Sequence, residues 1–237
     1  MPDPNLFRLR VTFCKQGRLA LLSHLEVAHA LERAVRRAGL PFAVSQGFSP
    51  HMKIAFGAAL PVGVGGASEL FDLQMTRYER PEEALSALQA ARVPDLMCKR
   101  CEYVEPRAAA ASAAYPVGTY RALLSSAPAQ LPVPAEVRVV RKKKEKVLHV
   151  ADFLVGEMAL EGSALTFSLE SKPTGSLRPD VLLAACFAQA NAADGEADEP
   201  LALLVENAWT SSIDPEPPTA DNPLHALTIT RIDQRAF

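Results

Sequence analysis

The chain has 237 residues, 49% of them hydrophobic, which is long enough for two modest domains or one large one with a real core. Its formal net charge is −2 and its pI is about 6.2, so the overall charge gives no indication of nucleic-acid or membrane binding. The charge is uneven, however. Residues 1–57 hold eight Lys and Arg against three acidic residues, whereas the C-terminal stretch is acidic and proline-rich.

The N-terminus does not have the pattern of a signal peptide, and no long uncharged apolar run is present. We therefore expect neither secretion nor a membrane-spanning segment. Only four cysteines occur, which is not the density of a disulfide-stapled secreted domain. A reducing, cytoplasmic location fits this composition best.

The first hundred residues predict alternating strands and helices. Residues 6–14 alternate apolar and basic side chains, with the period of a half-buried strand. Ser23 and Glu26 have the spacing of a capping box, which predicts a helix over residues 24–38. The remaining elements, in chain order, are strands 52–57 and 69–76, a helix of about ten residues opened by Pro81, and strand 96–105.

This order, β-α-β-β-α-β, is typical of a ferredoxin-like unit. The small residues of segment 109–118 indicate a linker. The elements expected after it, strands 119–126 and 164–171, a helix at 179–191 and a final strand at 226–233, are compatible with a divergent second copy. We therefore predict an α+β fold of two ferredoxin-like units in tandem, with antiparallel sheets and the helices on one face. The domains would be residues 1–108 and 119–237. In the second, residues 134–140 are expected as a helix or loop, followed by a basic hairpin over 138–150.

The segment 44–69 is the best candidate for a binding site. Ser45, Phe48, His51 and Lys53 lie close together around Gly47, and Glu69 follows at the end of the segment. An ordinary connection needs only turn residues, whereas these side chains suit an anionic or planar ligand. Phe48 packing into the core and His51 as a structural histidine are alternatives.

The helix expected over 24–38 adds cationic groups to this region. The main role expected for Ser23 is that of the N-cap of this helix. His24 lies in the first turn and should be neutral, because a positive charge is disfavoured at a helix N-terminus. Arg33, Arg36 and Arg37 lie off the apolar stripe. Guanidinium groups suit bidentate contacts with phosphate or carboxylate, although plain surface charge is an equal alternative.

Two further motifs have simpler explanations. Cys98 and Cys101 form a single C-x-x-C pair inside an expected strand, so ordinary strand cysteines are the default and a metal site is the minor alternative. Six of the nine residues 138–146 are basic, including Lys142, Lys143 and Lys144. Such a run is usually a solvated hairpin, but it could contact a nucleic-acid backbone. No phosphate-binding loop or radical SAM cluster motif is present, and no cofactor is expected.

At the level of motifs, the chain resembles the radical SAM-linked family, a domain of unknown function that occurs beside or fused to radical SAM proteins. The resemblance is close over residues 8–75 and weaker beyond. It rests on Lys15 with Gly17, on Ser23-His24 with Glu26, on residues 33–41, on the S-x-G-F-x-P-H motif of residues 45–51, and on Ser68-Glu69. It implies a stand-alone partner of a radical SAM protein.

The leading hypothesis is a non-catalytic protein that binds RNA and presents it to a radical SAM enzyme. In it, Arg33, Arg36, Arg37, Lys53 and Lys142 to Lys144 contact phosphate, Phe48 or His51 contacts a base, and Ser45 and His24 fix the loop. One alternative is a metal-independent, ribonuclease-like enzyme in which His24 or His51 acts as general acid or base. Others are a small-anion or cofactor-binding module and a purely structural adaptor.

Overall fold

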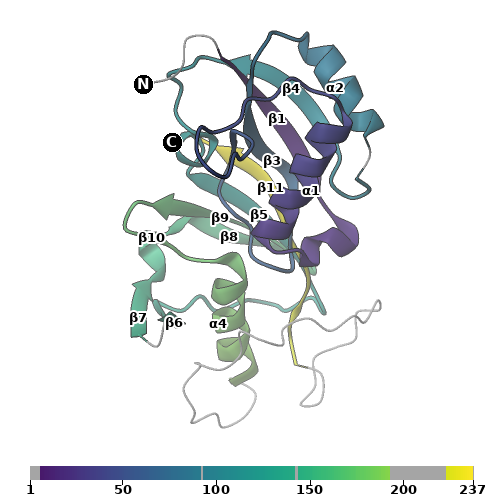
Figure 1. Ribbon diagram of the computed structural model, residues 1–237. Helices are drawn as coiled ribbons and strands as arrows, with labels where there is room; N and C mark the ends of the chain where they lie inside the picture. Colours follow the sequence, from purple (N-terminus) through teal and green to yellow (C-terminus); the bar gives the residue numbers. More distant parts are fainter. Residues whose placement is uncertain (1–5, 92, 142–143, 193–222, 237) are drawn as a thin grey trace. The chain divides into compact units, whose positions relative to one another are not determined.

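The computed structural model describes residues 6–91, 93–141, 144–192 and 223–236. The chain divides into two compact units, Met1–Pro116 and Val117–Arg235, which are treated separately below as unit 1 and unit 2. Figure 1 shows the elements in the colours of the sequence. In the described part of the chain no helix is long and apolar enough to cross a membrane.

Unit 1 contains four antiparallel strands in the order β2–β3–β1–β4. Two helices of ten or more residues connect them, and the short elements η1 and α3 complete the unit. In chain order the elements are β1 (Phe7–Lys15), η1 (Gly17–Leu21), α1 (His24–Arg37), β2 (Ile54–Phe56), β3 (Val64–Met75), α2 (Pro81–Ala90), β4 (Cys98–Val104) and α3 (Ala111–Ala114). The predicted capping box at Ser23 and the proline opening of α2 are confirmed.

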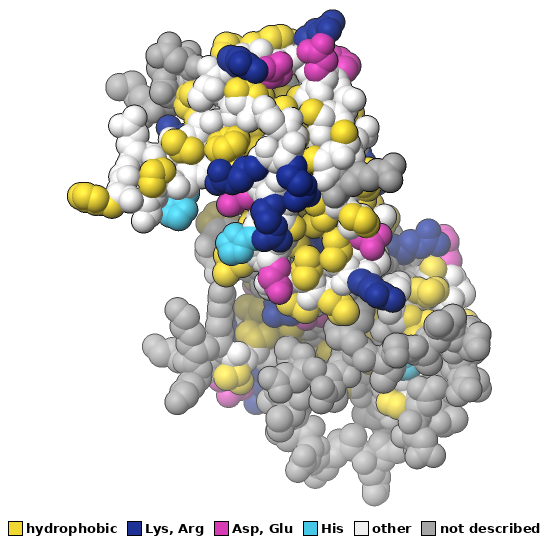
Figure 2. Space-filling view, turned by 45° about the vertical axis from the view of Figure 1, so that its right-hand side comes forward, with side chains coloured by type: hydrophobic (Ala, Val, Ile, Leu, Met, Phe, Trp, Pro, Cys, Tyr) yellow, Lys and Arg dark blue, Asp and Glu magenta, His cyan; other side chains and the backbone are white. Residues whose placement is uncertain are grey.

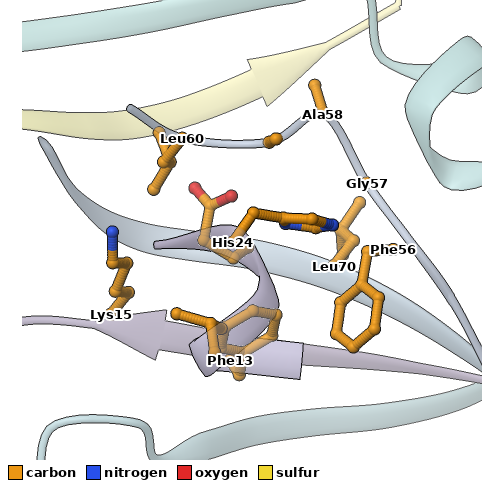
Figure 3. Close-up of a pocket in the computed structure, with 11 residues that line it drawn as sticks. Phe13, Lys15, His24, Phe56, Gly57, Ala58, Leu60 and Leu70 are labelled. Atoms are coloured by element: carbon orange, nitrogen blue, oxygen red, sulfur yellow. The ribbon is translucent and has the colours of Figure 1, made fainter. Parts of the chain in front are cut away.

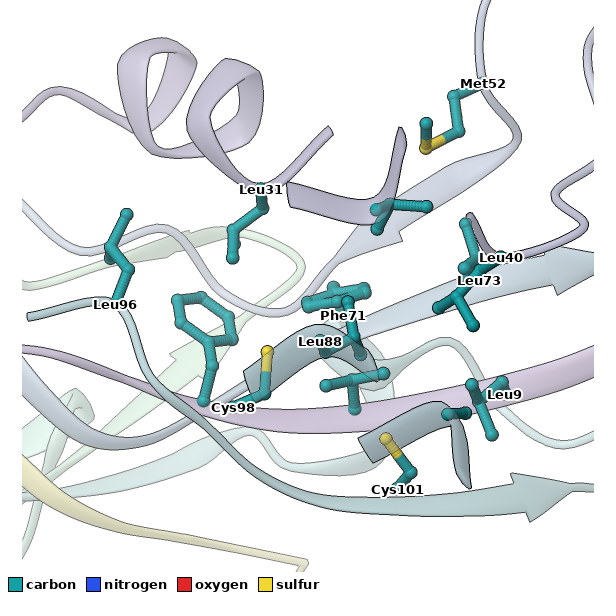
Figure 4. Packing of buried hydrophobic residues seen from close by; sticks show 14 of the residues in the cluster. Leu9, Leu31, Leu40, Met52, Phe71, Leu73, Leu88, Leu96, Cys98 and Cys101 are labelled. Carbon is teal, nitrogen blue, oxygen red and sulfur yellow. The ribbon is translucent and has the colours of Figure 1, made fainter. Parts of the chain in front are cut away.

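The core of unit 1 lies between this sheet and the two longer helices (Figure 4). Successive strand residues point to opposite faces, so Leu9, Val11 and Phe13 of β1 all face the helices. Phe71 and Leu73 of β3 pack beside them and are fully buried. Burial of large apolar side chains of this kind, at about 25 cal/mol per Å², is the main stabilising contribution to the fold.

Unit 2 is built around a second group of antiparallel pairings. β5 lies between β9 and β11, and β9 also pairs with β8 and β10. Its elements are β5 (Val117–Leu124), β6 (Glu136–Arg141), β7 (Lys144–His149), η2 (Val150–Asp152), β8 (Leu154–Glu161), β9 (Ala164–Lys172), β10 (Gly175–Ser176), α4 (Pro179–Ala192) and β11 (Ala226–Arg235). The hairpin β6–β7 forms a separate two-stranded sheet.

The prediction of two tandem ferredoxin-like units is wrong. The fold is α+β with a large nine-stranded sheet and a separate two-stranded one. Unit 2 has only one α-helix among its described residues, and strands occupy positions where a second βαββαβ copy needs another helix. Most of the segment 134–140, expected as a helix or loop, instead lies in β6, which begins at Glu136 and whose β-branched valines favour an extended backbone. The strand expected over 69–76 begins earlier, because β3 spans Val64–Met75.

Candidate functional site

The N-terminus of α1 is held by reciprocal hydrogen bonds. Ser23 Oγ accepts from the Glu26 backbone N–H at 3.4 Å, and Glu26 Oε2 accepts from the Ser23 backbone N–H at 2.8 Å. Ser23 Oγ–H also donates to Glu26 Oε2 at 2.7 Å, and these bonds lower the pKa of Glu26. His24 is therefore placed at the first residue of the helix by a defined cap.

His24 lines a pocket at one end of the unit 1 sheet (Figure 3). The pocket is small and open to solvent on one side, and the segment 57–60 borders it. The empty space of about 350 Å³ within its bounds includes part of that open side, so only a small fraction of it is enclosed. Its apolar side chains come from β1, α1, β2, β3 and that segment: Phe13, Val27, Phe56, Leu60 and Leu70. Lys15, His24 and Glu69 add polar groups. The pocket therefore combines an apolar lining with an ammonium, an imidazole and a carboxylate.

Lys15 and Glu69 are buried charges that end two apolar stripes. On β1 the inward positions Leu9, Val11 and Phe13 are followed by Lys15, which is only 2% exposed. On β3 Glu69, 5% exposed, precedes the fully buried Phe71 on the same face. The register pairs Phe13 with Glu69 and Lys15 with Gly66, with a β-bulge between them. Both charges therefore lie at the same end of the sheet.

Gly66 makes room for the Glu69 side chain. A Cβ atom placed on Gly66 would lie 2.7 Å from Glu69 Cδ, which is closer than carbon atoms approach in proteins. The Glu69 carboxyl group thus lies against the backbone of Gly66, directly across from Lys15. Lys15 Nζ donates a hydrogen bond to the Val64 carbonyl at 3.3 Å. These contacts fix where the two charges lie within the pocket.

The His24 ring belongs to a chain of aromatic contacts. Its centroid is 5.4 Å from that of Phe56, with the ring planes at 86°, and Phe56 is 5.9 Å from Phe71. Phe71 in turn contacts Phe13 at 5.8 Å. The His24–Phe56 contact is edge to face and the other two are tilted, and such contacts favour defined ring orientations. The aromatic wall of the pocket is therefore anchored in the core.

The loop between the bridge residues Val44 and Met52 is closed by its own hydrogen bonds. The Ser45 backbone N–H donates to the His51 carbonyl at 2.8 Å, and the His51 N–H donates to Ser45 Oγ at 3.0 Å. Phe48 lies within this loop with a relative exposure of 111%, so the alternative that it packs into the core is wrong. His51 is exposed as well, and Lys53 is half-buried just before β2.

The three arginines of α1 are all exposed. Arg37 donates from Nε and Nη2 to the Ala91 carbonyl at 3.2 and 2.9 Å, and the Arg36 guanidinium lies 5.0 Å from the centroid of the Phe42 ring. Figure 2 shows Lys and Arg side chains gathered on one face, with His side chains nearby. The helix thus presents cationic groups, two of which have a defined contact.

Of the basic run, Lys142 and Lys143 lie outside the described residues, and Lys144 begins β7. The hairpin expected there is present as β6–β7. It is charged on both strands, since Arg138 lies 3.6 Å from Glu145 and His149 lies 3.2 Å from Glu136. These contacts are exposed and contribute little to stability.

Cys98 and Cys101 are buried in the unit 1 core, where their side chains appear among leucines in Figure 4. Burial raises the pKa of each thiol to about 12, so at neutral pH both are protonated. Among the described residues no group of three or more His, Cys, Asp or Glu side chains has the geometry to hold a metal ion. The two cysteines therefore behave as core residues.

A buried ion cluster on the other face of the sheet was not foreseen from the sequence. Arg8 and Arg10 both donate to Asp72: Arg8 Nε to Oδ2 at 3.0 Å and Arg10 Nε to Oδ1 at 2.7 Å. The carbonyls of Ala108 and Ala109 accept further guanidinium hydrogen bonds. Burial would raise the pKa of Asp72, but the hydrogen bonds from Arg10 and Arg8 outweigh it and the pKa is lowered.

The fold and the pocket define an α+β protein in which unit 1 carries a small, partly enclosed cavity with a buried pair of opposite charges. Residues 8–179 match the family described as "Uncharacterized protein conserved in bacteria (DUF2344)", and the chain belongs to this family. No curated protein matches the chain. The family description agrees with a bacterial domain of unknown function and says nothing of radical SAM enzymes.

Proposed function

We propose that this protein binds RNA and presents it, without catalysing a reaction itself, to a radical SAM enzyme. The observation that carries the RNA-binding part is Phe48, whose ring is fully exposed within a loop closed by the Ser45–His51 hydrogen bonds. An exposed aromatic ring held on an ordered loop is a platform on which an unstacked base can stack. The radical SAM part rests on the motif resemblance described above.

The cationic groups of unit 1 support the same proposal. Arg33, Arg36 and Arg37 are exposed on α1, and the chain continues from that helix to the Phe48 loop. Two of these guanidinium groups are already positioned, by the Ala91 carbonyl and by the Phe42 ring. Pre-positioned arginines lose less conformational entropy when they contact phosphate. Lys53 and the basic hairpin would extend the phosphate contacts.

The state of the cysteines supports the non-catalytic part of the proposal. All four are buried free thiols, and burial raises the pKa of Cys98, Cys101 and Cys186 to about 12. A thiol becomes a nucleophile only as the thiolate. The strongest potential nucleophiles in the chain are therefore packed away as core residues.

Fluorescence anisotropy with labelled single-stranded RNA tests RNA binding. We expect Phe48→Ala to weaken binding by about 1–3 kcal/mol, the contribution of one stacked base, and Arg33→Glu to reduce the salt dependence. Matched controls are Val133→Ala, which truncates an exposed apolar residue outside the loop and the hairpin, and Arg121→Glu, which reverses an exposed charge in unit 2. Absence of binding by the wild type, or equal weakening in the controls, would refute this part.

Size-exclusion chromatography tests the partnership separately. The purified protein is mixed with a cluster-loaded radical SAM protein of the kind that the motif resemblance implies, with and without the RNA that binds best. A shared elution peak, made stronger by RNA, supports presentation of RNA to the enzyme. Separate elution under both conditions at tens of micromolar protein would remove the radical SAM partner from the proposal while leaving RNA binding intact.

A further inference from the structure

The strongest unexplained feature is the pair of charges buried in the pocket. Removing a carboxylate or an ammonium from water costs several kcal/mol, and mutual attraction often does no more than offset that cost. A leucine at either position would continue the apolar stripes of β1 and β3 at no such cost. Lys15 and Glu69 nevertheless line a cavity whose other walls are mostly apolar, and both are almost fully buried. Charges kept at such a position are candidates for recognising a ligand.

The signs of the charges restrict the ligand. A phosphate would be attracted by the Lys15 ammonium but repelled by the Glu69 carboxylate. A simple cation would be attracted by Glu69 but repelled by Lys15. The two groups together suit an uncharged group that presents an acceptor beside a donor. An ammonium carries three donor hydrogens and a carboxylate several acceptor positions. A ligand can therefore bind alongside the contacts that these groups make within the protein.

The walls of the pocket restrict the ligand further. Leu60 belongs to the segment that borders the pocket, and the His24 ring meets the Phe56 ring edge to face (Figure 3). Apolar and aromatic walls favour a planar apolar ring with polar atoms along one edge. A nucleobase has this combination of a flat face and an edge of donors and acceptors.

We propose that the pocket binds the Watson–Crick edge of a single unstacked nucleobase, with guanine preferred. Guanine offers O6 as acceptor to the Lys15 ammonium, and its N1–H and N2–H donors suit the two oxygens of the Glu69 carboxylate. Adenine presents a donor where guanine presents O6, so it would face the Lys15 ammonium unfavourably. That the base comes from RNA rests on the proposed function, whereas the base preference itself does not.

The first experiment leaves the protein unchanged and varies the base. Binding of uridine-rich hexanucleotides that carry one central guanosine, inosine or adenosine is measured by anisotropy. Inosine keeps O6 and N1–H but lacks the N2 amino group. We expect guanosine to bind about 10-fold or more tighter than adenosine, with inosine between them. Equal affinities for the three oligonucleotides would overturn the pocket assignment, even if all of them bind well.

Two variants locate the preference in the pocket. Glu69→Gln keeps the side-chain shape and should remove most of the preference for guanosine over adenosine. Ala59→Phe places a ring at the exposed edge of the pocket without touching the buried charges and should have the same effect, whereas Ala90→Phe on α2 is its matched control. The melting temperature of each variant is measured alongside. An unchanged preference in folded Ala59→Phe would contradict the proposal.

Free GMP and AMP separate the two possible sources of the base. Saturable binding of GMP, preferred over AMP and lost in Ala59→Phe, supports the pocket even if no RNA is bound, and in that case the proposed RNA function fails alone. If RNA binds without any base preference, the proposed function stands and the assignment of the pocket to guanine fails. If neither GMP nor guanosine-containing RNA shows a preference, the inference is overturned.

Discussion

The two faces of the unit 1 sheet bury charge in different ways. On one face Arg8, Arg10 and Asp72 form a cluster whose guanidinium groups also bond to the carbonyls of Ala108 and Ala109. On the face toward α1, Lys15 and Glu69 border an open cavity. Both groups are almost fully buried, so burial alone does not distinguish them. The surroundings do: the first cluster is enclosed by protein donors and acceptors, whereas the second pair, which has contacts of its own with the protein, also lines a cavity.

The first cluster has a structural explanation. The register places Arg10 directly opposite Asp72, and Arg8 two residues along the same face. The carbonyls of residues 108 and 109 belong to the segment that leads into α3, so the guanidinium groups connect this segment to the sheet. A buried charge network of this kind fixes one arrangement of the chain, and its removal should act on stability. Removal of the Lys15–Glu69 pair should act on binding.

The largest expected effect is that of Asp72→Ala. It would leave two buried guanidinium groups without their carboxylate, which typically costs about 3–5 kcal/mol in the free energy of unfolding. Urea denaturation followed by circular dichroism measures this. Arg121→Glu, at an exposed position of β5, serves as control and should change stability by less than about 0.5 kcal/mol. A loss below about 1 kcal/mol in Asp72→Ala would contradict the structural assignment.

Acid should reproduce part of this loss in the wild type. Because the pKa of Asp72 is lowered in the folded state, its ionised form contributes stability that is fully present above the unfolded pKa of about 3.9. That contribution is lost as the pH falls through the lower, folded pKa. The difference in unfolding free energy between wild type and Asp72→Asn should therefore be constant near neutrality and shrink below about pH 4. A difference that does not change down to pH 2 would contradict the lowered pKa.

Much of unit 1 could be predicted from the sequence because its signals are local. The alternation in residues 6–14, the capping box at Ser23 and the proline that opens α2 are all local signals, and all three elements are present. Unit 2 could not be predicted in the same way. Pairing among β5, β8, β9 and β11 joins segments far apart in the chain, and β8 was missed altogether.

The candidate site was predicted only in part. Ser45, Phe48 and His51 do lie in one loop, and His24 does begin α1, but whether these residues bind a ligand stays a prediction. The meaning of Lys15 depends on a β-bulge and on which strand lies beside β1, neither of which leaves a local signal. Asp72 is similar, since its partners are more than 60 residues away in the chain. The only sequence signal for Lys15 was a charged residue at the end of the apolar stripe of β1.

Replacing the second pair by apolar residues should have a smaller effect on stability, in the opposite direction. In Lys15→Met/Glu69→Leu both charges are removed together, so neither is left without the other. Such replacements are often neutral or stabilise the fold by about 1–4 kcal/mol. We expect a gain of about 1 kcal/mol by urea denaturation, together with loss of any preference for guanosine. If the free energy of unfolding of the double variant falls by more than about 2 kcal/mol, the Lys15–Glu69 pair has a structural role like that of the Asp72 cluster.

The smallest expected effect on stability is that of Phe48→Ala. The ring is fully exposed in the free protein, so its truncation removes almost no buried area, whereas Phe71, with no exposed surface, is held on all sides by the core. We expect Phe48→Ala to change the free energy of unfolding by less than about 0.5 kcal/mol. A much larger loss would mean that the ring has a packing role in solution, and the exposed ring could no longer support the RNA-binding proposal. If stability is unchanged and RNA binding is weakened, Phe48 belongs with Lys15 and Glu69, as a residue that ligand binding needs and the stability of the fold does not.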